Sequence, residues 1–167
     1  VTNHALLCFN TLRSENKILP VRPVLIVDEA HELQRYAINA LTQALEYETL
    51  GSFVNHPLAR DAVPADYRQQ VMEHNGAFFE AVLARRPDRW SERWALSDTV
   101  QEGIALWNAL QRIQSQLKTQ QSGTEDQGKL DALVRFGEEV LQTVHMLAHP
   151  EPATAIRYGE LNGDGRK

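Results

Sequence analysis

The hydrophobic positions along the chain change from one continuous run near its start to a helical spacing over most of the remainder. Residues 24–27 (Val-Leu-Ile-Val) form an unbroken aliphatic run, which is typical of a buried strand in a parallel sheet covered on both faces. From Glu29 to about Leu50 the apolar residues instead recur three or four positions apart, and Gly51 follows them. The same spacing returns at about residues 65–86, 98–117 and 129–147. The pattern therefore predicts one buried strand followed by about four long helices.

Polar and proline-bearing stretches separate these elements. Residues 55–57 and 61–64 have the composition of loops, Pro87 and Asp88 break the helix that precedes them, and Ser97 or Asp98 is a candidate cap for the next helix. The polar connection at residues 120–128 predicts an antiparallel helical hairpin. Near the beginning, Thr2 or Asn3 is a candidate cap for a short helix at residues 5–12. After the last helix, residues 153–158 are a candidate strand, and residues 159–167 have the composition of a frayed tail.

Length, charge and cysteine content narrow the classes of protein. A chain of 167 residues is long enough for one core and a fragment of a second domain. The single cysteine, Cys8, rules out a disulfide framework within the chain and is interpreted as a small buried hydrophobic residue. Because no apolar run reaches the length of a membrane span, we expect a soluble, cytoplasmic protein without a membrane partner. A net charge of −5 disfavours nucleic-acid binding by bulk electrostatics, so any DNA contact requires local basic patches.

The candidate chemistry directly follows the aliphatic run. Asp28, Glu29, Ala30 and His31 come where a parallel strand would end, which is the edge at which α/β folds bind ligands. In a nucleotide hydrolase one acid at this position holds Mg²⁺, usually through water, and a second acid orients or deprotonates the attacking water. Asp28 and Glu29 fit these two roles. The alternative is that both acids merely begin a helix and complement its dipole.

Two segments carry a resemblance to a known family. Residues 24–33 contain the DEAH tetrad, and residues 1–7 contain Asn-His-Ala-Leu-Leu about twenty residues upstream. In this order they resemble the DEAH-box helicases of superfamily 2, and more narrowly the DinG/XPD-type DNA helicases. The resemblance covers about the first fifth of the chain. It implies a mainly α fold in which residues 1–31 are a small α/β remnant of a RecA-like motor domain, residues 32–152 are the helical arch insertion and residues 153–167 return the chain to the motor.

The same resemblance implies a function and its cofactors. The parent protein would be an ATP-dependent DNA helicase, 5′-to-3′ in direction, acting in repair or replication. Its ATP site would include Asp28, which holds Mg²⁺ through water, the catalytic residue Glu29, and His31, which couples nucleotide state to the motor. The phosphate-binding loop with its lysine is absent from these 167 residues, so the isolated fragment is expected to be inactive. Some relatives bind an iron–sulfur cluster through four cysteines, which would lie before Val1.

A second candidate site combines arginines with tryptophans. Cations interleaved with flat aromatic rings are typical of surfaces that bind single-stranded nucleic acid by phosphate contact and base stacking. We therefore predict contacts to single-stranded or forked DNA from a set of six residues, which comprises Arg85, Arg86, Arg89, Trp90, Arg93 and Trp94. The alternative is that the tryptophans pack in the core while the arginines pair with Asp88, Glu92 and the end of the preceding helix.

Two other interpretations stay open. His145 and His149 have the spacing of metal ligands on a helix, but Met146 stands where a zinc protease needs glutamate, and histidines near the C-terminal end of a helix are also favoured by its dipole. For the whole chain, the rival to a helicase is a non-catalytic helical protein-interaction module in which the DEAH tetrad is coincidental. The sequence indicates no oligomeric state.

Overall fold

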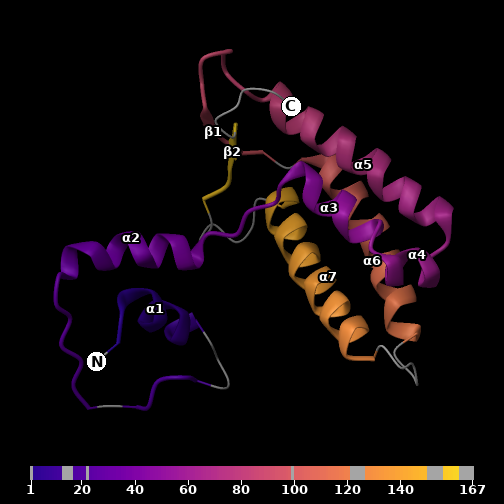
Figure 1. Cartoon of the computed structure of the whole chain (residues 1–167). Helices are drawn as coiled ribbons and strands as arrows, with labels where there is room; N and C mark the ends of the chain where they lie inside the picture. The colour runs from indigo at the N-terminus through magenta and orange to yellow at the C-terminus, as the bar shows by residue number, and fades with distance from the viewer. Residues whose placement is uncertain are drawn as a thin grey trace. The chain divides into compact units, whose positions relative to one another are not determined.

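Figure 1 shows a computed structural model of the chain, which describes residues 2–12, 17–21, 23–98, 100–120, 127–149 and 156–161. The fold is mainly α, with one small two-stranded sheet. The chain divides into two compact units, Val1–Ala44 and Leu45–Lys167. This division falls after α2 (Ala30–Leu41), whereas the resemblance places it after His31, because α2 packs against α1 (His4–Leu12).

The first unit is a pair of helices joined by an extended connection. Asn3 caps α1, as predicted, since its Oδ1 accepts a hydrogen bond from the Leu6 N–H at 2.8 Å. The ring of His4 on α1 lies 5.5 Å from the ring of Tyr36 on α2. None of the described residues of this unit is buried, so its two helices form a thin layer without a closed core.

The strand predicted at residues 24–27 is not observed. These residues are extended but belong to no sheet, and the side chain of Ile26 is 89% exposed. The prediction was wrong for this structure because a buried strand depends on neighbouring strands, and the described part of the first unit contains none.

The long helix predicted from Glu29 to Leu50 is also wrong. Helix α2 ends at Leu41, where both the N–H and the hydroxyl of Thr42 donate to the Ile38 carbonyl, at 2.9 and 2.7 Å. A new helix, α3 (Tyr47–Val54), begins after an extended link, and Gly51 lies inside it. The apolar spacing continues across the link, which is why the pattern alone concealed the break.

The described part of the second unit contains five helices. Besides α3 they are α4 (Pro57–Ala62), α5 (Ala65–Ala84), α6 (Gln101–Thr119) and α7 (Gln127–Ala148). Helix α6 packs along both α5 and α7, and α3 packs on α5 (Figure 1). The three long helices α5, α6 and α7 begin and end within three residues of the prediction. Helix α4 replaces part of a predicted loop, with Pro57 at its first position, where a missing N–H costs nothing.

The core of the second unit lies between these helices and follows the predicted apolar stripes. Its largest fully buried apolar side chains include Leu50, Phe78, Leu106, Leu110, Ile113 and Leu117. One buried polar contact joins two helices, because the Gln114 amide on α6 donates to the Val134 carbonyl on α7 at 2.7 Å. Gly137 on α7 faces this amide, and a side chain at that position would collide with it.

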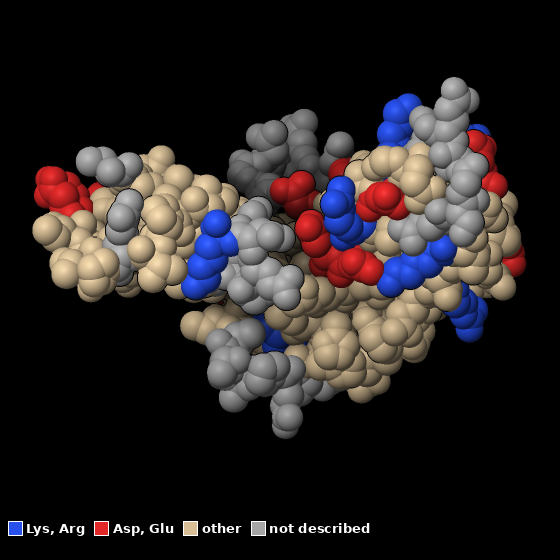
Figure 2. Space-filling model, turned by 90° about the horizontal axis from the view of Figure 1, so that it is seen from below, with Lys and Arg blue, Asp and Glu red and all other residues tan. Residues whose placement is uncertain are grey.

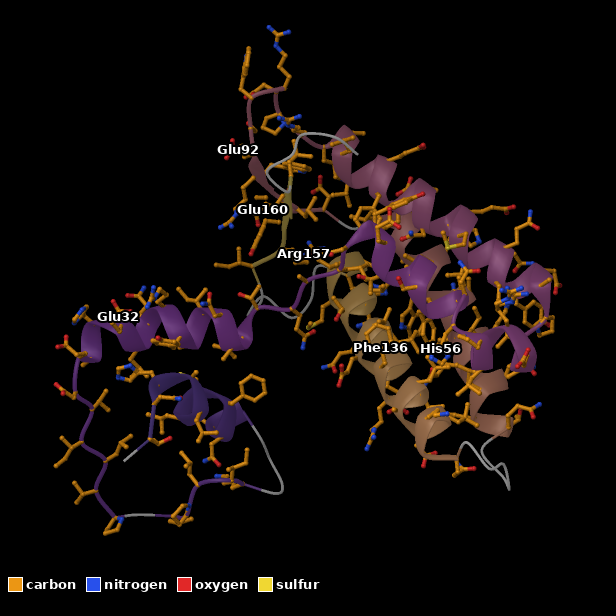
Figure 3. All side chains as sticks on the ribbon, in the orientation of Figure 1. Glu32, His56, Glu92, Phe136, Arg157 and Glu160 are labelled. Carbon is orange, nitrogen blue, oxygen red and sulfur yellow. The ribbon has the colours of Figure 1, made fainter. Side chains whose placement is uncertain are left out.

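A two-stranded antiparallel sheet closes the second unit. Strand β1 (Arg93–Ala95) pairs with β2 (Tyr158–Glu160), and Trp94 lies opposite Gly159. The Arg157 guanidinium donates to the carbonyls of Leu147 and Ser97 at 2.9 and 3.2 Å, which ties β2 to the end of α7 (Figure 3). The return strand was predicted at residues 153–158. Residues 153–155 lie outside the described residues, and the described strand pairs within the second unit.

The surface carries charges of both signs. On the face shown in Figure 2, acidic and basic side chains are interspersed, as expected for a chain whose basic and acidic residues are nearly balanced. Among the described helices, none combines the length and the apolar character needed to cross a lipid bilayer.

Candidate functional site

The first candidate site joins the two sequence motifs of the first unit. His4, from the Asn-His-Ala-Leu-Leu segment, places its Nε2 2.8 Å from the backbone carbonyl oxygen of Asp28 in the DEAH tetrad. A carbonyl only accepts hydrogen bonds, so the imidazole must carry its proton on Nε2. The contact spans 24 positions in sequence and links the start of α1 to Asp28, two positions before the start of α2.

The backbone at the tetrad turns sharply. Glu29 has φ 47° and ψ 46°, the left-handed conformation, which costs a non-glycine residue of order 1 kcal/mol. Its N–H is held by the Asp28 carboxylate at 2.9 Å, and its carbonyl accepts from the Glu32 N–H at 2.9 Å. This turn converts the extended segment into α2 and places two adjacent carboxylates at the junction.

The side chains of the tetrad form a small exposed network of charges. His31 Nδ1 lies 3.3 Å from a Glu29 oxygen, and its Nε2 lies 3.7 Å from a Glu32 oxygen. Glu32 also pairs with Arg35 on the next turn of the helix. The histidine is therefore bracketed by two acids, one of which is the predicted catalytic residue. Asp28 and Glu29 present hard oxygen ligands of the kind that Mg²⁺ prefers.

Among the described residues, no group of three or more histidine, cysteine or acidic side chains is arranged so that it could hold a metal ion. The ring centres of His145 and His149 lie 4.5 Å apart with their planes tilted by 40°. The ring centre of Trp107 lies 5.4 Å from that of His145. Cys8 is half-buried, as a small apolar residue of a thin unit would be.

The second candidate site is divided by the structure. Trp94 is only 6% exposed, and its indole N–H donates to the Val82 carbonyl at 3.0 Å. Gly159 faces it across the sheet. Trp94 is thus a core residue, and its prediction as a DNA contact was wrong because strand β1 points it inward.

Three of the four arginines have structural partners. Arg93 pairs with Glu160 at 2.8 Å and lies over the Tyr158 ring. The hydrogen bond that the guanidinium donates to Glu160 raises the pKa of Arg93 above its ordinary value. Arg86 donates to the carbonyls of Ser91, at 2.6 Å, and of Arg89. Arg85 donates to the Ala81 carbonyl at the end of α5. Arg85 thus contacts the end of the preceding helix, as the structural alternative expects, whereas Arg93 pairs with Glu160 and not with the expected Glu92.

The remaining two residues, Arg89 and Trp90, lie in a tight turn between α5 and β1. Trp90 is 76% exposed, and the Arg89 guanidinium lies 4.6 Å from the centre of its ring. The Asp88 carboxylate builds the turn, because one oxygen accepts the N–H groups of Trp90 and Ser91 at 2.7 and 2.9 Å and the other accepts the Ser91 hydroxyl at 3.1 Å. These bonds, the Trp90 N–H first, hold the pKa of Asp88 below its ordinary value.

Sequence reasoning missed two features of the second unit. The first is the role of Asp88 in organising the turn. An aspartate commonly accepts a hydrogen bond from the backbone N–H two residues later, and this is a recognisable turn signal. The other feature is an open hollow of about 440 Å³ between α3 and α7, lined by His56, Phe53 and Phe136 among others (Figure 3). Its residues come from distant parts of the sequence, so no local pattern indicates it.

In comparisons with protein-family models, curated proteins and solved structures, no match to this chain is found. Any function assigned to this chain therefore rests on the two motifs and on the geometry within each unit.

Proposed function

We propose that this chain is part of an ATP-dependent DNA helicase of the DEAH-box type. In this proposal residues 1–31 belong to the first, RecA-like motor domain, and residues 32–152 form its helical arch insertion, from which residues 153–167 return. The observation that carries the proposal is the 2.8 Å hydrogen bond between His4 and Asp28, because it joins the two segments that carry the family resemblance.

The residues of the tetrad suit the binding of magnesium and ATP. Asp28 and Glu29 are adjacent, exposed and acidic, and Mg²⁺ typically keeps several waters while it contacts one or two carboxylates. Bound Mg²⁺ would neutralise charge on the phosphates of ATP. Asp28 would hold the hydrated ion, and Glu29 would accept a proton from the attacking water. His31, between Glu29 and Glu32, is positioned to respond when the charge on Glu29 changes.

The remainder of the ATP site would come from outside these residues. In the resembled family a phosphate-binding loop precedes the two motifs and a second motor domain follows them. Phosphoryl transfer depends almost entirely on positioning and charge stabilisation, so the residues described here supply one part of the site. The proposed direction, 5′-to-3′, and the proposed role in repair or replication rest on the resemblance alone.

The proposal is tested by ATP hydrolysis in the full polypeptide that contains residues 1–167. Glu29→Gln removes the proposed base while keeping its shape, and we expect it to lower kcat by about 10²–10⁴-fold with nucleotide binding retained. Glu48→Gln, which neutralises an exposed glutamate on α3, is the matched control and should leave kcat unchanged. A wild-type protein without DNA-stimulated ATP hydrolysis, or a Glu29→Gln variant as active as wild type, would refute the proposal and favour the protein-interaction module.

A further inference from the structure

The turn between α5 and β1 presents one large aromatic side chain to solvent. Trp90 is the most exposed tryptophan side chain in the described part of the second unit, at 76%, while Trp94 four residues later is buried. Removal of a side chain of this size from water is strongly favourable, so the exposure of Trp90 leaves a substantial apolar surface available for binding.

The turn is built so that Trp90 is held in place. Asp88 accepts the N–H groups of Trp90 and Ser91, while Arg86 donates to the carbonyls of Arg89 and Ser91. The backbone on both sides of Trp90 is therefore fixed by side chains that themselves belong to the turn. A turn whose backbone is already fixed loses little backbone entropy on binding, which is the general basis of preorganised recognition.

One face of the indole is occupied by a cation. The Arg89 guanidinium lies 4.6 Å from the ring centre, within the range of a cation–π contact. A flat ligand can stack on the opposite face, and the guanidinium stays close enough to contact a phosphate attached to that ligand. This pairing of a stacking surface with an adjacent cation is the chemistry that binds single-stranded nucleic acid without sequence preference.

We propose that the turn formed by residues 86–91 is a platform for one unpaired base of single-stranded DNA, which stacks on Trp90 opposite Arg89. The inference rests on the proposed function in so far as the protein acts on DNA. The sequence predicted DNA contacts from six arginines and tryptophans. The proposed site instead binds a single nucleotide through Trp90 and Arg89, and Asp88 and Arg86 are its positioning residues.

Other ligands fit this turn less well. A tryptophan buries about 150–250 Å², whereas a specific protein interface takes about 800 Å² from each partner. Trp90 is the only large apolar side chain of residues 85–93 that is exposed, and insertion into a membrane surface requires an apolar face of several residues. Residues 85–92 contain three arginines and two acids, a local positive excess in a chain of net charge −5.

The test uses the 167-residue chain, a labelled oligothymidylate and an abasic oligonucleotide of equal length, with binding followed by fluorescence anisotropy. The Trp90→Ala variant loses one base–aromatic stack, so its affinity for oligothymidylate should be about 5- to 150-fold lower than that of wild type. Trp90→Phe, which keeps a stacking ring, should recover most of the affinity. Phe136→Ala, at a half-exposed aromatic on α7, is the control and should bind as wild type does.

The abasic oligonucleotide separates stacking from phosphate contact. It keeps the phosphates, so Trp90→Ala should change its affinity little. The proposal is overturned if Trp90→Ala binds oligothymidylate as tightly as wild type does, or if the substitution weakens binding of both oligonucleotides equally. It is overturned as well if the wild-type protein binds neither oligonucleotide at tens of micromolar. It is also overturned if Trp90 emission responds to phosphatidylserine–phosphatidylcholine vesicles and not to oligothymidylate. None of these results depends on ATP hydrolysis, so the base-stacking site and the proposed helicase activity are tested independently of each other.

Discussion

Gly137 on α7 lies directly against the Gln114 side chain of α6, and replacing this glycine with alanine is expected to destabilise the protein. A β-carbon at this position would meet the Gln114 side-chain oxygen and would lie 2.9 Å from the Phe53 ring. Gln114 cannot move freely, because its amide donates to the Val134 carbonyl at 2.7 Å inside the core. The substitution therefore forces either the amide or the ring out of place.

The expected size of the effect follows from three contributions. Overpacking of a filled core costs about 1–3 kcal/mol, and a buried hydrogen bond that is broken leaves groups unsatisfied at a further cost of about 1–3 kcal/mol. Alanine in a helix interior is favoured over glycine by about 1 kcal/mol. We expect the free energy of unfolding to fall by about 3 kcal/mol, measured by urea denaturation with the helical circular dichroism signal.

The matched control is Gly76→Ala on α5, where nothing lies within 4 Å of an added β-carbon. This variant gains the helix preference alone and should be stabilised by about 0.5–1 kcal/mol. In a Gln114→Ala background, Gly137→Ala should cost less because the amide is gone. If Gly137→Ala instead stabilised the protein as Gly76→Ala does, the packing of α6 on α7 described here would be wrong.

Three further outcomes are expected. Gly159→Ala would place a β-carbon 2.6 Å from the Trp94 ring, so it should separate β1 from β2. Acrylamide should then quench the fluorescence of Trp94 more strongly, and unchanged quenching would contradict this. The fold lowers the pKa of Asp88, so the carboxylate stabilises the turn above its ordinary pKa and loses this effect as the pH falls through the lowered value. The emission of Trp90 should therefore change below about pH 4. Asp88→Asn should remove this acid response, and its persistence would assign it to another group. The 167-residue chain alone should release no phosphate from ATP above background, and hydrolysis that Glu29→Gln abolishes would refute this.

Sequence patterns predicted the long helices well and the short or isolated elements poorly. The stripes of α5, α6 and α7 run over several turns, and burial of such a stripe against neighbouring helices leaves little choice of structure. Residues 24–27 have the composition of a buried strand, but a buried strand forms only where neighbouring strands pair with it. The break between α2 and α3 and the short helix α4 depend on local contacts that the apolar spacing does not encode.

The candidate sites show the same difference. The DEAH tetrad and the Asn-His-Ala-Leu-Leu segment are recognisable as motifs, but the bond from His4 to the Asp28 carbonyl depends on how α1 meets α2. Trp90 and Trp94 each follow an acidic residue and an arginine, so their different environments could not be told apart from sequence. A turn organised by Asp88 followed by a short strand makes one of them exposed and the other buried.

The most direct test of the proposed helicase is strand separation by the full polypeptide that contains residues 1–167. A forked or tailed duplex is incubated with the protein and Mg-ATP, and release of the labelled strand is followed for wild type and Glu29→Gln. We expect ATP-dependent release from a duplex with a 5′ tail, little release from one with a 3′ tail, and none with Glu29→Gln. Absence of release by the wild type, or equal release by Glu29→Gln, would contradict it.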